Sequence, residues 1–78
     1  MGTYAHHYTD GTPLTMLVDT SPGTVLYIGE ALPGSLTTEP LWRIQKIDTS
    51  TSVISIQWAV GNQTFSNVWD DRATYAYS

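Results

Sequence analysis

The chain contains no cysteine, so neither disulfides nor thiolate metal sites can support its fold. Its only histidines are the adjacent His6 and His7, with no second His or Cys pair to complete a zinc site. At 78 residues it lies near the lower end of what one hydrophobic core can stabilise. Domains of this size often rely on a disulfide, a metal or a partner. We therefore expect a domain without metal or cofactor that associates with other proteins and with copies of itself.

Charge is scarce as well. Charged residues make up 13% of the chain, about half the usual share, and the formal net charge is −4. Because a nucleic-acid-binding protein needs several cations to displace counterions, the three basic residues predict no DNA or RNA partner. Without a long apolar run or a basic, apolar export signal, we expect neither membrane association nor export. The lack of cysteine fits synthesis in a reducing cytoplasm.

Turn-forming residues recur about every ten positions and separate short runs of β-branched and aromatic residues. This spacing predicts an all-β fold, a small antiparallel β-barrel or sandwich, with residues 1–78 forming a single domain. Residues 1–12 are interpreted as an N-terminal arm or an edge strand. One short helical turn is expected near residues 67–72, where apolar residues fall at helical spacing.

Residues 53–60 give the clearest strand pattern, because large apolar side chains alternate with small or polar ones. Its expected partner is the strand at 41–47, joined to it by a hydroxyl-rich loop in an antiparallel hairpin. Ile47 breaks the alternation of that partner, and we interpret the break as a β-bulge near Lys46 that turns Ile47 toward the core.

Further strands are expected at 24–31, at 14–18 and at the two ends, 3–8 and 74–78. Apolar residues of the strands and of the helical turn form the predicted core. Its members are Leu26, Ile28, Trp42, Ile44, Ile54, Ile56, Trp58, Phe65 and Trp69.

No set of residues can be assigned the roles of nucleophile, base and stabiliser, so we predict a protein without catalytic residues. Asp70 and Asp71 are adjacent and point apart, which does not suit an acid/base pair. The favoured interpretation is structural, with one Asp bound to local backbone donors and Arg72 paired with a nearby carboxylate. A calcium site is the alternative, and it would need more oxygen ligands than the sequence identifies.

Tyrosines gather in the terminal segments, where they offer contact area and a hydrogen-bonding tip at low entropic cost. We interpret these segments as protein-interface residues, and a sugar-stacking platform built from the same residue types is the alternative. The candidate interface residues are Tyr4, His6, Tyr8, Tyr75 and Tyr77.

Residues 24–78 resemble a group of short, mostly uncharacterised proteins encoded among the structural genes of tailed bacteriophages. The resemblance lies in the order and spacing of four segments and the ending YAYS at 75–78. The four segments are LYIGEALPGS at 26–35, LWRIQKI at 41–47, WAVGN at 58–62 and FSNVWDDRA at 65–73.

The group tends to read Trp-Ala-Asp-Gly where this chain has Val60 in place of the Asp, which puts an Asp-Gly turn or a cation bound there in doubt. The resemblance supplies no catalytic residues. It implies a virion component, synthesised in the cytoplasm of the bacterial host: a head-accessory (decoration) subunit or a tail-associated part that binds other virion proteins. A receptor- or glycan-binding module of a phage fibre is the alternative function.

Overall fold

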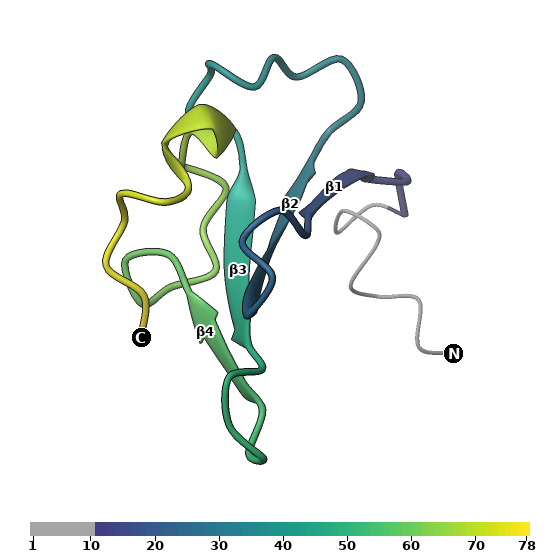
Figure 1. Ribbon diagram of the computed structural model, residues 1–78. Helices are drawn as coiled ribbons and strands as arrows, with labels where there is room; N and C mark the ends of the chain where they lie inside the picture. The colour runs from purple at the N-terminus through teal and green to yellow at the C-terminus, as the bar shows by residue number, and fades with distance from the viewer. Residues whose placement is uncertain (1–10) are drawn as a thin grey trace.

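A computed structural model describes residues 11–78 and folds them into one four-stranded antiparallel sheet (Figure 1). The strands follow one another in the order β1-β2-β3-β4, and within the described range the only helix is the 3-10 turn η2. The all-β class is thus confirmed, with its one short helical turn. The elements are β1 (Thr15–Asp19), β2 (Val25–Ala31), β3 (Arg43–Asp48), β4 (Ser55–Trp58) and η2 (Trp69–Asp71).

The sheet is open, so the predicted barrel or sandwich does not form. β1 and β4 are the two end members of the strand order, and no second sheet packs on the first within residues 11–78. The second layer is instead the irregular C-terminal segment, residues 65–78, with η2 inside it (Figure 1). Two isolated bridges, Trp42↔Asn67 and Ala59↔Tyr77, fasten this segment to the sheet.

Aspartates end β1 and β3 and start the turns that follow them. Asp19 Oδ1 accepts a hydrogen bond from the Ser21 backbone N–H at 2.9 Å, and Asp48 Oδ1 accepts one from Ser50 N–H at 2.9 Å. Such side-chain bonds mimic a backbone turn and favour reversal of the chain. Gly23 adopts a φ of 90° in the first of these turns, a conformation that glycine reaches without steric cost.

The β2–β3 and β3–β4 ladders run without interruption, so the β-bulge predicted near Lys46 is wrong. Every residue from Arg43 to Asp48 has one partner on β2 in a constant register, and Ile47 pairs with Leu26 and Ile56. Since side chains alternate between faces, Ile47 points away from the side that carries Ile44. The break in the apolar pattern marks a second apolar face and not a re-aimed side chain.

The core lies between one face of the sheet and the C-terminal segment. Trp42 and Ile44 are fully buried there and Trp69 nearly so, and the rings of Trp42 and Trp69 lie 6.1 Å apart in a tilted pair. Gly29 makes this approach possible, because a Cβ at that position would overlap the Trp69 ring. The core cluster comprises Ala31, Trp42, Ile44, Ala59 and Trp69.

The remaining predicted core residues divide in two groups. Leu26, Ile28, Trp58 and Phe65 are only partly buried. Ile54 and Ile56 are exposed, so their assignment to the core is wrong. Residues 55–59 alternate as predicted, but the buried residue among them is Ala59, whose backbone N–H donates a hydrogen bond to the Ile44 carbonyl at 3.0 Å. The larger side chains of β4 therefore point to the opposite face.

Two terminal strand predictions have different outcomes. Residues 74–78 do not form a strand and contribute one bridge at Tyr77, together with hydrogen bonds between Ser78 and Trp58 of 3.0 and 3.2 Å. The predicted strand at 3–8 lies outside the described residues.

Candidate interaction surface

The face of the sheet opposite the core carries a second set of apolar side chains. Strand alternation places them there, because their neighbours in sequence pack into the core cluster or against it. We call this surface the open face. It consists of Met16, Val18, Leu26, Ile28, Glu30, Arg43, Gln45, Ile47, Ile56 and Trp58.

Cross-strand pairing arranges the open face in three rows. The first row joins Leu26, Ile47 and Ile56 across β2, β3 and β4. The second row joins Val18, Ile28, Gln45 and Trp58 across all four strands. The third row joins Met16, Glu30 and Arg43. Six of the seven residues in the first two rows are apolar, which gives the face a continuous apolar field.

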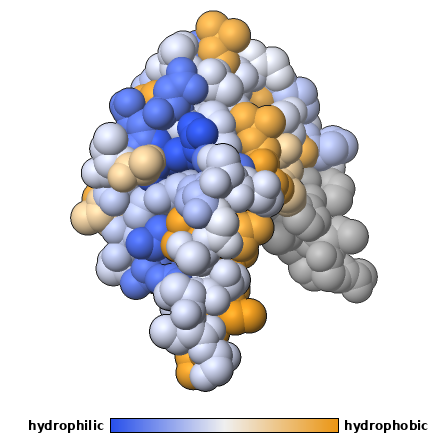
Figure 2. All heavy atoms as spheres, viewed as in Figure 1, coloured by the Kyte–Doolittle hydropathy of each residue, from blue (hydrophilic) through white to orange (hydrophobic). Residues whose placement is uncertain are grey.

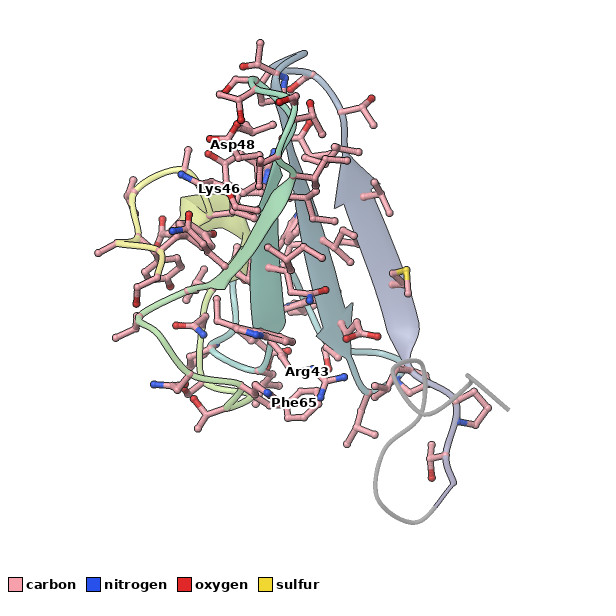
Figure 3. All side chains as sticks on the ribbon, turned by 90° about the horizontal axis from the view of Figure 1, so that it is seen from below. Arg43, Lys46, Asp48 and Phe65 are labelled. Carbon is pink, nitrogen blue, oxygen red and sulfur yellow. The ribbon has the colours of Figure 1, made fainter. Side chains whose placement is uncertain are left out.

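The apolar field is accessible at both sheet edges. Val18 on β1 is 51% exposed and Ile56 on β4 is 57% exposed, while the central strands contribute half-buried side chains. The field continues into the β3–β4 loop, where Ile54 is 61% exposed. In Figure 2 apolar atoms lie over the tip of this hairpin and beside β1 and β2, while hydrophilic atoms gather around η2. In Figure 3 the strands lie in front and η2 is partly hidden behind β4.

Two of the three residues of the third row, Glu30 and Arg43, form an ion pair. Glu30 is only 3% exposed, and its Oε1 accepts hydrogen bonds from Arg43 Nη2 at 2.7 Å and Nε at 3.2 Å. The guanidinium also lies over two rings, with its Cζ 4.8 Å from the centroid of Phe65 and 5.7 Å from that of Trp58. Figure 3 shows Arg43 and Phe65 together at the end of β3 opposite Asp48. The pair adds no net charge to the open face.

A small apolar pocket lies beyond the ion pair. It has a volume of about 130 Å³ and is lined by Leu32, Ser35, Leu41 and Phe65. Leu32 and Leu41 are both exposed and lie next in alternation after Glu30 and Arg43, so the pocket extends the open face along the strands. Its size suits one apolar side chain of a partner better than a drug-sized ligand.

Charged groups on the other side of the sheet serve the fold. Arg72 Nε donates to Asp19 Oδ2 at 2.9 Å, and its guanidinium lies 4.6 Å from the Trp69 ring centroid. Asp70 and Asp71 are exposed, and no group of three potential metal ligands forms among residues 11–78. The predicted pairing of Arg72 with a carboxylate is therefore observed, with Asp19 as the partner.

Hydrogen bonds and burial shift three pKa values. Bonds from Ser21, aided by Arg72, lower the pKa of Asp19 to about 2. The bonds from Ser50 likewise lower the pKa of Asp48. Burial raises the pKa of Tyr77 above its usual range. None of these three groups belongs to the open face, and their shifts follow from turn and core contacts.

Tyr75 and Tyr77, predicted as interface residues, pack partly buried against the core cluster. Tyr75 Oη accepts a hydrogen bond from the Val68 backbone N–H at 2.7 Å, and Tyr77 Oη donates to the Arg72 carbonyl at 2.7 Å. Both hydroxyls are therefore used within the domain, and the assignment of these two partly buried residues to an interface stays a prediction. The other candidates, Tyr4, His6 and Tyr8, lie outside the described residues.

Sequence reasoning missed the open face as a surface. The sequence did contain a signal for it. Apolar residues occupy both alternating sets of positions in 24–31, so both faces of that strand are apolar, and Ile47 interrupts the alternation in 41–47.

Comparisons with protein-family models, curated proteins and solved structures find no match. In the part of the chain that the structure describes, no helix has the length and apolarity needed to cross a membrane.

Proposed function

We propose that this chain is a non-enzymatic structural subunit of a tailed-phage virion that binds other virion proteins through its open face. The observation that carries the proposal is the apolar field of the first two rows. The C-terminal segment leaves this field uncovered, because its Trp69, Tyr75 and Tyr77 pack on the other side of the sheet and its Phe65 lies at the third row. Contiguous exposed apolar surface on a small domain marks a contact site. The resemblance to phage structural proteins supports the choice of setting.

The proposal covers a head-accessory or tail-associated position in the particle, after synthesis in the host cytoplasm. A glycan-binding module has weaker support, because a stacking platform needs exposed aromatic rings. Trp42 and Trp69 are buried in the core, and Trp58 lies against the Arg43 guanidinium.

The test uses virions of the phage that encodes the chain. Mass spectrometry of purified particles is expected to detect the protein. Ile56→Lys puts a charge in the first row and is expected to remove the subunit from the particles. Leu36→Lys is the matched control, because Leu36 is similarly exposed at 62% but lies in the β2–β3 loop. Absence of the unmodified protein, or normal incorporation of Ile56→Lys, would overturn the proposal.

A further inference from the structure

We infer that the open face binds a second copy of this chain, so that two sheets pack face to face and enclose a shared apolar layer. The inference rests on the proposed function, since it assigns a partner to the same surface. In each copy, residues 11–78 supply one sheet with a core on one side, and packing two such sheets through their open faces produces the two-sheet sandwich that residues 11–78 do not form alone.

The charge distribution favours a like partner. The charged residues of the open face are Glu30 and Arg43, which form an ion pair, so the face carries no net charge. The formal net charge of −4 therefore resides on the rest of the chain. A second copy brings an equally neutral face, and the like charges of the two chains stay away from the contact. A charged partner would find no complementary group on this surface.

The geometry also fits a two-fold contact. In a two-fold dimer the same patch serves both copies, so the patch must be self-complementary. Rows of Leu, Ile and Val meet this condition, because apolar side chains need no specific donor or acceptor opposite them. The apolar pocket formed by Leu32, Leu41 and Phe65 at the edge of the face can accept one side chain of the partner.

The area sets the expected strength. The ten positions of the open face, each about 4.8 Å by about 6.8 Å, cover roughly 330 Å² in projection, or about 650 Å² for two copies. The relief of the side chains and the pocket add to this area, which stays at or below about 1,200 Å², the lower limit of stable interfaces. We therefore expect a dimer that dissociates on dilution, and one that the high local concentration within a particle would favour.

Sedimentation velocity of the full chain tests the inference between about 10 µM and about 1 mM, the range in which a contact of this size dissociates. The unmodified chain is expected to shift from monomer to dimer with concentration. Ile56→Lys and Val18→Lys should each raise the dissociation constant at least about tenfold, because each dimer would bury two unpaired ammonium groups. Leu36→Lys should leave it unchanged.

Tryptophan quenching locates the contact. Trp58 lies on the open face, whereas Trp42 and Trp69 are in the core. Acrylamide quenching of the unmodified chain should therefore fall as its concentration rises, and it should stay constant in Trp58→Phe. A concentration-dependent change that persists in Trp58→Phe would place the contact elsewhere and overturn the inference.

Other results would also overturn it. A chain that stays monomeric to about 1 mM has no self-contact of this kind. A monomer that dimerises only after deletion of residues 1–10 would show that the chain's own N-terminal residues occupy the face. A dimer that survives both lysine variants with unchanged affinity uses another surface. If the chain is monomeric in solution but Ile56→Lys is lost from virions, the proposed function survives while the self-contact fails.

Discussion

Val60 lies in the turn after β4 and adopts a left-handed backbone conformation that Asn, Asp and Gly adopt at lower cost. Its φ is 56° and that of Gly61 is 71°, so both central residues of the turn from Ala59 to Asn62 have positive φ. The Asn62 N–H donates to the Ala59 carbonyl at 3.4 Å across this turn. Turns with two positive φ values prefer Asn-Gly or Asp-Gly, and a β-branched residue there is strained. Val60→Asn should therefore stabilise the fold.

The size of the gain follows from two terms. A residue with a Cβ in the left-handed region lowers the stability of the fold by about 1–2 kcal/mol, and Asn reduces this cost through local hydrogen bonds. Val60 is 59% exposed, so replacing its side chain removes little apolar burial, a loss of about 0.5 kcal/mol or less. The net increase in the free energy of unfolding is about 0.5–1 kcal/mol, and the melting temperature should rise by about 2–8 °C.

Thermal and urea unfolding followed by circular dichroism measure this difference. Val53→Asn is the matched control, because Val53 is 76% exposed and is not among the residues with positive φ. The control should show no gain. If Val60→Asn melts at or below the temperature of the unmodified chain, or if both variants gain equally, the turn strain does not exist.

Three further predictions concern the core, the ion pair and the first turn. Gly29→Ala should lower the unfolding free energy by about 1–3 kcal/mol in urea melts, because its Cβ overlaps the Trp69 ring; an unchanged midpoint would refute this packing. Arg43→Ala should cost about 3 kcal/mol by removing the cation beside the buried Glu30 carboxylate, and Arg43→Ala combined with Glu30→Leu should recover part of that loss; equal stability of single and double variants would contradict it. Because the pKa of Asp19 is lowered to about 2, its ionised form stabilises the fold above about pH 4, and this contribution disappears as the pH falls toward 2. The stability deficit of Asp19→Asn at neutral pH should therefore narrow in acid, and a deficit independent of pH would argue against the turn contact.

Local sequence signals predicted the four strands of the sheet and the turns at Asp19 and Asp48. Aspartates and Gly23 marked the β1–β2 and β3–β4 turns, and the hairpin between 41–47 and 53–60 forms as expected. These features depend on residues a few positions apart, whose turn chemistry and alternation are visible in the sequence.

The side of the sheet that becomes the core could not be predicted in this way. Both faces of β3 and its neighbours carry apolar residues, so alternation alone does not select one. The choice is made by the C-terminal segment, whose Trp69 packs on Gly29 and Trp42 from far along the chain. The interpretation of Ile47 as bulged assumed a single apolar side. The apolar residues on both faces of the strands produced this error. They are also the clearest sequence signal of the candidate interaction surface.

The position of Trp69 late in the chain has a consequence for biosynthesis. All four strands leave the ribosome before the residue that completes their core. Until residues 69–77 emerge, the nascent sheet has two uncovered apolar sides and open edges, the features that promote association with other nascent chains. A product truncated before Trp69 should accordingly accumulate in inclusion bodies or be degraded.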